Sequence, residues 1–178
     1  MRNILITLFI LCFSILSFEK GFSRQTTIDS LLKVFNDSTK GDTVRLKAVH
    51  WLCGAVLWKT NIDSMYQVSQ LMLKFAQEKK LPKWETTALR MLAISTSDKG
   101  NYSESIKYLF QALKIYDSLR SQGGVAMVLQ QIGNEYHSMN DLNKALEYGF
   151  KSLEIYQKSW KELNTGIVLG NIGNIYKD

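Results

Sequence analysis

The chain has 178 residues, and its 22 Lys and Arg outnumber its 16 Asp and Glu, which gives a net charge of +6 at neutral pH. This length suits one domain or one short array of repeats. The basic residues are spread among acidic and amide side chains, which is typical of a solvated polar surface, so we expect no nucleic-acid partner.

The first residues differ from the rest of the chain. Arg2 precedes a nearly unbroken apolar run over residues 4–18, and Gly21 and Ser23 follow with the spacing that a signal peptidase prefers. This arrangement predicts a secretory signal peptide over residues 1–23 and export to the periplasm or the extracellular space. The apolar run is shorter than the roughly 20 residues of a membrane-spanning helix. An uncleaved anchor formed by residues 4–18 is the alternative, and it is the only membrane contact that we expect.

From residue 26 onward, apolar residues recur at spacings of three and four, which predicts amphipathic helices. A lone helix is expected over 26–37. It is followed by helix pairs near 43–58 and 62–79, near 84–98 and 102–120, and near 125–139 and 142–160, with a last helix near 163–177. Pro82 and the Gly123-Gly124 pair are expected in the turns before the helices that follow them. Asn101 and Glu104 have the spacing of a capping box at the start of a helix.

One sequence pattern returns at intervals of forty residues. It is clearest in two helices, where the residues of one are matched by those of the other: Leu129, Ile132, Gly133, Asn134 and Tyr136 by Leu169, Ile172, Gly173, Asn174 and Tyr176. A glycine inside a helix costs about 1 kcal/mol relative to alanine. We therefore expect another helix to approach closely at Gly133, with Ala145 as the contact.

The order of Leu129, Ile132, Gly133, Tyr136 and Ala145 resembles the tetratricopeptide repeat, whose first helix carries W-x2-L-G-x2-Y and whose second helix carries a small residue. Leu129 stands at the tryptophan position. The resemblance implies an all-α fold, an α-solenoid of antiparallel helix pairs that forms a right-handed superhelix. Forty residues exceed the roughly 34 of the common repeat, so the extra residues lengthen either the connection between pairs or both helices.

The same resemblance divides the chain into a signal peptide over 1–23 and a repeat domain over 24–178. Within that domain it predicts the lone helix at 26–37, repeats at about 42–81, 82–121 and 122–161, and an incomplete repeat at 162–178. No second helix follows the last first helix, so its side around Gly173 is expected to be uncovered and to allow self-association.

The sequence contains none of the motifs that carry a recognisable catalytic or cofactor chemistry, such as H-E-x-x-H, C-x-x-C, a phosphate-binding loop or G-x-S-x-G. His50 and His137 have no second ligand at metal-binding spacing on their helices. Cys53 stands at the repeat position of Ala93 and Gly133, which predicts a small buried residue. We therefore expect no catalytic residue, no cofactor and no metal, and the chain is not expected to be an enzyme.

The resemblance places function on a concave groove lined by the first helices of the pairs. The groove residues that it implies are Lys47, His50, Arg90, Ile94, Met127, Gln130, Asn134, His137, Asn174 and Lys177. Asn134 and Asn174 match the asparagine that binds a peptide backbone in many family members. Gln130 and Gly170 stand where carboxylate-binding members have lysine. The resemblance thus implies an exported bacterial scaffold that binds a protein or peptide. The alternative is the N-terminal sensory part of a membrane-bound signalling protein, such as a histidine kinase or a transcriptional regulator.

Overall fold

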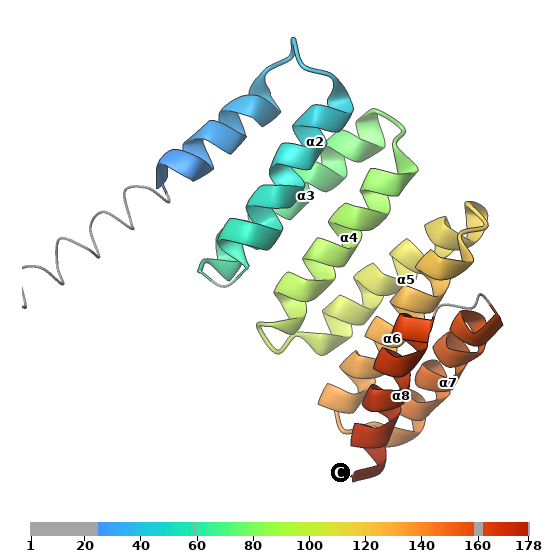
Figure 1. Ribbon diagram of the computed structural model, residues 1–178. Coiled ribbons are helices and arrows are strands. Elements are labelled where there is room, and N and C mark those ends of the chain that lie inside the picture. Colours follow the sequence, from blue (N-terminus) through green and yellow to red (C-terminus); the bar gives the residue numbers. More distant parts are fainter. Residues whose placement is uncertain (1–24, 59, 159–161, 178) are drawn as a thin grey trace, which may run out of the picture. The chain divides into compact units, whose positions relative to one another are not determined.

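The computed structural model describes residues 25–58, 60–158 and 162–177, and over these ranges every regular element is a helix. A helix covers residues 25–36. The elements that follow are α2 (Asp42–Trp51), the π-helical turn η1 (Leu52–Leu57), α3 (Ile62–Glu78), α4 (Pro82–Ser97), α5 (Tyr102–Ser118), α6 (Gln122–Ser138), α7 (Leu142–Lys158) and α8 (Glu162–Lys177) (Figure 1). The predicted signal peptide lies outside the described residues. Within them, no helix combines the length and the apolar character that crossing a membrane requires.

The described part of the chain divides into two compact units, one up to Val56 and one from Leu57 onward. In the first unit, the side chain of Arg45 on α2 joins the helix over 25–36. Its Nε donates a hydrogen bond of 2.6 Å to the backbone oxygen of Phe35, and its guanidinium carbon lies 5.7 Å from the centre of the Phe35 ring. Phe35 is buried, so an ionic group and an aromatic ring together fix the angle between these helices.

The predicted helix near 43–58 is not a continuous α-helix. It ends as α-helix at Trp51 and continues as the π-helical η1. Gly54 lies inside η1, and a Cβ there would meet nothing within 4 Å of the described residues. A glycine without a packing partner gives little support to the α-helical form, which is consistent with the local change of winding. Cys53 is fully buried, as its repeat position predicts.

The second unit repeats its helices with a period of forty residues. The helices α3, α5 and α7 begin at Ile62, Tyr102 and Leu142, and α4, α6 and α8 begin at Pro82, Gln122 and Glu162. All six have 16 or 17 residues. The connections from α3 to α7 have only three or four residues each. The residues beyond the common repeat length therefore lengthen both helices and not the connection between pairs.

These connections share one geometry that returns every twenty residues. The backbone has a positive φ at Lys80, Gly100, Arg120 and Asn140. At each of them the next backbone N–H donates to the carbonyl oxygen five residues earlier, as in Leu81 to Ala76 (2.9 Å) and Ser121 to Tyr116 (2.9 Å). This hydrogen bond is the signature of the Schellman motif, which satisfies the last carbonyl groups of a helix. The chain thus reverses in the same way within a pair and between pairs.

Pro82 and Gly123-Gly124 were expected in turns, and the structure places both in first turns of helices instead. Pro82 is the first residue of α4, where its missing N–H would have no helical partner in any case. Gly124 lies in the first turn of α6, and a Cβ there would overlap the ring of Tyr116 on α5. The glycine is therefore needed for the close passage of an aromatic ring and not for a turn.

The capping box expected at Asn101 is not formed. Asn101 occupies the N-cap of α5, but its side chain makes no capping hydrogen bond. Capping side chains are found at other helix starts: Asn61 Oδ1 accepts from Ser64 N–H at 2.9 Å, and Asp141 Oδ1 accepts from Lys144 N–H at 3.2 Å. A cap residue needs the right backbone conformation as well as the right side chain, and spacing alone does not specify it.

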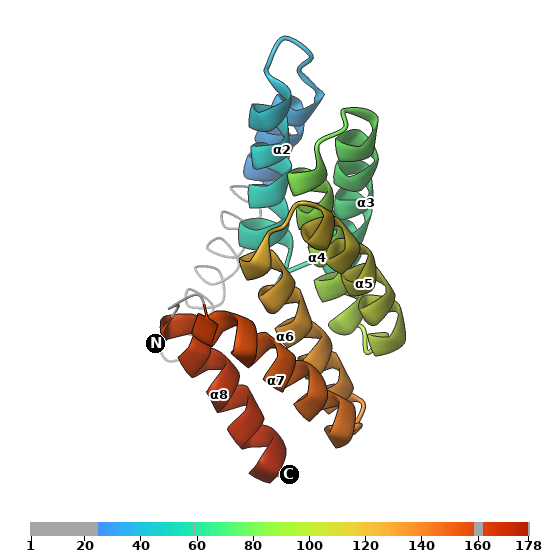
Figure 2. The same ribbon diagram turned by 90° about the vertical axis from the view of Figure 1, so that its right-hand side faces the viewer.

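Each helix of the second unit packs against the next, and Figure 2 shows α6, α7 and α8 as neighbours. Buried residues of α4, α5 and α6 form one apolar cluster, and those of α6, α7 and α8 form another. At Gly133 of α6, a Cβ would lie 3.1 Å from the backbone oxygen of Ala145 and 3.4 Å from the backbone nitrogen of Gly149. The predicted close approach between Gly133 and Ala145 is confirmed.

Candidate functional site

Polar side chains join the first helices of the pairs, α4, α6 and α8, directly to one another. Arg90 Nε on α4 donates a 2.8 Å hydrogen bond to Gln131 Oε1 on α6. Asn171 Nδ2 on α8 donates a 3.1 Å hydrogen bond to Asn134 Oδ1 on α6. These contacts lie beside the stripe of residues predicted to bind a ligand, so the three helices present one shared surface. We call this surface, with the predicted residues on α4, α6 and α8, the first-helix face.

The predicted site residues on α6 lie on one side of that helix. Met127, Gln130, Asn134 and His137 follow one another at spacings of three and four. Asn134 is exposed, and the other three are half-buried. The neighbouring helices add the remaining members of the face: half-buried Arg90 and Ile94 on α4, and exposed Asn174 and Lys177 on α8.

Lys47 and His50 are also predicted site residues, and both are exposed on α2. That helix belongs to the first unit. They are therefore not part of the first-helix face as defined on α4, α6 and α8.

The first-helix face carries few charges. The sequence of α6 contains one charged residue, Glu135, which is only 8% exposed, and α8 has none between Glu162 and Lys177. In contrast, α7 has charged residues along its length, and Lys151 and Lys158 pair with Glu147 and Glu154 on the same helix. The exposed surface of α6 therefore consists of amide, hydroxyl, histidine and apolar side chains.

Gln131 and Asn171 are members of this surface that the sequence reasoning missed. Each lies next to the predicted stripe, half-buried, and each bonds to another first helix. The two residues are forty positions apart, so they occupy the same repeat position. An amide repeated at one position is a signal that could have identified them.

Glu135 is a buried carboxyl group behind the face. Its Oε2 accepts a 2.8 Å hydrogen bond from the Ser97 hydroxyl at the end of α4. Burial raises the pKa of Glu135, the hydrogen bond from Ser97 opposes this rise, and the negative charge of Asp98 adds to it. Because the carboxyl group joins α4 to α6 and is largely covered, we assign it a role in positioning these helices.

Hollows in the surface lie elsewhere. One of about 460 Å³ is lined by Gln122 and Leu129 of α6 and by Lys151, Glu154, Ile155 and Lys158 of α7. Another of about 410 Å³ lies at the start of α5. Within the described residues, no group of three or more His, Cys, Asp or Glu side chains is placed to hold a metal ion.

Helices of constant length, a forty-residue period and a layer of joined first helices define an α-solenoid of helix pairs. The family model of the tetratricopeptide repeat matches residues 84–158, which cover nearly all of α4 to α7. The chain is a tetratricopeptide-repeat protein. The sequence resemblance and the predicted fold class are thus confirmed.

Solved structures with similar folds include other proteins of this class. The tetratricopeptide-repeat domain of Arabidopsis FLU is 24% identical with a TM-score of 0.59, over 64% of this chain and 95% of that one. BtubC (BKLC) from P. vanneervenii is 18% identical with a TM-score of 0.65, over 89% and 70%. A putative kinesin light chain of P. anserina with nearly identical repeats is 12% identical with a TM-score of 0.59, over 90% of both chains. No curated protein matches the sequence.

Proposed function

We propose that the chain is a non-enzymatic scaffold that binds an extended segment of a partner protein on the first-helix face. Tetratricopeptide repeats serve protein interaction, and the observation that carries the finer proposal is the charge-poor, amide-rich surface of α6 and α8. An amide side chain offers both donors and an acceptor, which match the N–H and C=O groups of an extended backbone. Covering amides removes less favourable hydration than covering charges, so such a surface is suited to binding uncharged peptide groups.

Contacts between the helices support this proposal because they hold the amides in place before any ligand arrives. Asn134 accepts a hydrogen bond from Asn171, and its own NH2 group retains donors for a ligand. Arg90 holds Gln131 in the same way. Side chains that are already ordered lose less conformational entropy on binding. Ile94 and Met127 add apolar surface beside the amides for the side chains of the bound segment.

The test is a peptide selected from a library for binding to the purified chain, measured by fluorescence anisotropy. One or two lost hydrogen bonds should weaken binding about tenfold in Asn134→Ala and in Asn174→Ala. Asn143→Ala is the matched control, because Asn143 is exposed on α7 and lies away from the face. Equal affinity in all three variants would exclude the first-helix face as the binding surface.

We also propose export, on the basis of the apolar segment and the small residues that follow it. Sequencing the N-terminus of the protein from its native fractions tests this. A mature form that begins near Arg24 supports cleavage, whereas an intact Met1 in the membrane fraction supports the anchor over residues 4–18.

A further inference from the structure

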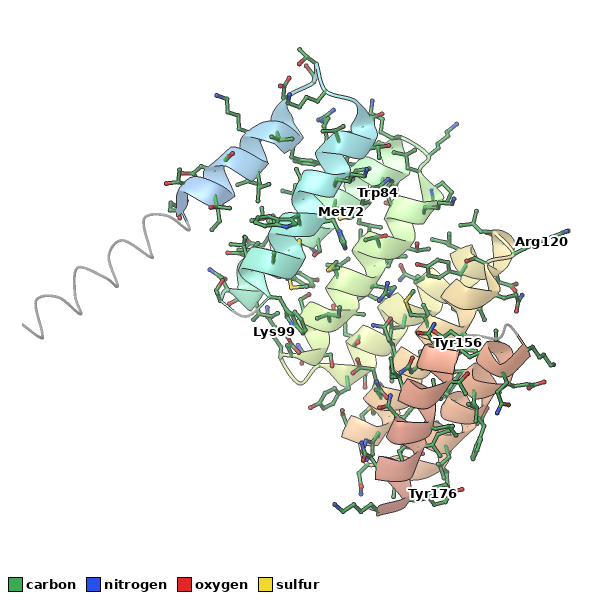
Figure 3. All side chains as sticks on the ribbon, in the orientation of Figure 1. Met72, Trp84, Lys99, Arg120, Tyr156 and Tyr176 are labelled. Atoms are coloured by element: carbon green, nitrogen blue, oxygen red, sulfur yellow. The ribbon has the colours of Figure 1, made fainter. Side chains whose placement is uncertain are left out.

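The helix α8 carries the same surface as α6, but one side of it is uncovered. In α6, the pattern residues Leu129, Ile132 and Gly133 are buried. In α8, Ile172 packs on Gly149 of α7, yet Leu169 is 49% exposed and Tyr176, labelled at the C-terminal end of the chain in Figure 3, is 69% exposed. A Cβ at Gly173 would meet nothing within 4 Å among the described residues.

The helix that covers the equivalent side of α6 shows what such a surface accepts. On α7, the backbone at Ala145 contacts Gly133, and the ring of Tyr148 stacks on Tyr136 with centres 5.5 Å apart and planes 9° apart. One turn further, the Ser152 hydroxyl donates a 2.7 Å hydrogen bond to the backbone oxygen of Ala126. The side of α7 that faces α6 therefore reads small residue, tyrosine, small residue at spacings of three and four.

The helix α5 presents the same pattern to α4. Ser105, Tyr108 and Ala112 occupy the positions of Ala145, Tyr148 and Ser152, and both small residues are fully buried. Two covered first helices of this chain are thus met by the same arrangement, small-x2-Tyr-x3-small. The uncovered side of α8 has Gly173 for the first small residue and Tyr176 for the tyrosine to stack on.

From this internal template we infer that the uncovered side of α8 docks an amphipathic helix of a partner protein, antiparallel to α8, with the pattern small-x2-aromatic-x3-small. Burial of Leu169 and Tyr176 and stacking on the Tyr176 ring provide the attraction. Gly173 permits the close backbone approach. This side of α8 differs from the side that carries Asn174, so the inference does not depend on the proposed function.

A second copy of the chain is a poorer occupant. Its helices α5 and α7 are already packed between first helices. Its helix over 25–36 has Gln25, Ile28 and Leu32 at the three pattern positions, so it offers neither a small residue nor an aromatic ring there. The pattern must therefore come from a different polypeptide.

The test uses a fluorescent peptide with the sequence of residues 142–158 as a stand-in for the partner helix, added to the 178-residue chain. We expect saturable binding and about a tenfold or greater loss in Gly173→Leu, because the leucine side chain occupies the space of the docking backbone. Gly170→Leu is the matched control: it lies on the same helix, its Cβ position is equally open, and its equivalent in α6 is Gln130 on the first-helix face. A peptide with Ala145 and Ser152 replaced by leucine should also bind about tenfold more weakly.

Several outcomes would overturn the inference. One is the absence of peptide binding to a chain that sedimentation shows to be monomeric. Equal losses in Gly170→Leu and Gly173→Leu are another. A dimer that Tyr176→Lys converts to a monomer would assign the surface to a second copy. A reading frame that continues past Asp178 into a helix with the same pattern would assign it to the same polypeptide.

Discussion

At Gly133 the backbones of α6 and α7 come so close that a single added carbon atom would lie 3.1 Å from a backbone oxygen. We predict that Gly133→Leu lowers the free energy of unfolding by about 1–3 kcal/mol, because the backbone of α7 cannot move aside as a side chain would. Gln130→Leu on the first-helix face should change stability by less than about 0.5 kcal/mol. Urea denaturation of both variants measures the difference, and equal losses would mean that the two sides of α6 are wrongly assigned.

Glu135 gives a prediction about pH. Because burial raises its pKa in the folded state above the unfolded value of about 4.3, the folded state binds the proton more tightly. Its contribution is then most favourable below the unfolded pKa, and it is lost as the pH rises through the raised folded pKa. Glu135→Gln keeps an acceptor for Ser97 without a charge. We expect this variant to equal or exceed the parent chain in stability at pH 7.

Urea denaturation across the pH range checks this, and the advantage of Glu135→Gln should shrink as the pH falls toward about 4. The conservative control is Glu104→Gln on α5, which neutralises a carboxyl group that is exposed. If Glu135→Gln instead loses stability increasingly toward high pH, the hydrogen bond from Ser97 to the carboxylate outweighs the cost of burial.

Single residues were predicted well where the repeat supplied a reason and poorly where the environment decided. The contact of Gly133 with Ala145 followed from the cost of a helical glycine. The burial of Glu135 did not, since a charged residue between helical apolar positions is normally solvated. The missing cap at Asn101 depends on backbone angles that spacing does not reveal. The amides Gln131 and Asn171 lie one position off the stripe that the family resemblance indicated.

At the scale of the elements, the turns provide a prediction with two signs. Gly100 has φ 78° and Arg120 has φ 53°, both in the left-handed region. Gly100→Ala should cost about 1 kcal/mol of unfolding free energy, because a Cβ disfavours this conformation. Arg120→Gly should raise stability, by less than about 1 kcal/mol, because the greater entropy of unfolded glycine offsets part of the relief. Thermal denaturation of both variants decides, and changes of the same sign would show that the side chain of Arg120 stabilises its turn by other contacts.

The helices themselves could be predicted because spacings of three and four report on burial along one side of a helix. Their ends were less certain: Pro82 and Gly123 were placed in turns, since both residues disfavour helix interiors. Both are compatible with a first turn, where few backbone N–H groups have partners. The π-helical η1 was not foreseen, because it keeps the same residues buried as a continuous helix would. Its burial pattern therefore carried no distinguishing signal.

For the whole molecule, the period of forty residues was sufficient to predict the α-solenoid, since each pair must bury its apolar sides against the next. The division at Val56 and Leu57 was not predicted, because the repeat continues across it without a change in composition. The surface chemistry also escaped prediction in part. A net charge of +6 describes the sum and not the distribution. Much of the charge lies on second helices such as α7, whereas the exposed side of α6 has almost none.

This distribution predicts how binding responds to salt. A basic chain that bound nucleic acid or an acidic segment through its net charge would lose affinity steeply as ionic strength rises. A ligand held by amides and apolar side chains on the first-helix face should instead change its Kd by less than about threefold between roughly 50 and 500 mM NaCl. Anisotropy titrations of the selected peptide, with a DNA duplex as the comparison ligand, measure both dependences. Peptide affinity that falls with salt as steeply as DNA affinity would show that charged second-helix residues, and not the amides of α6 and α8, form the contact.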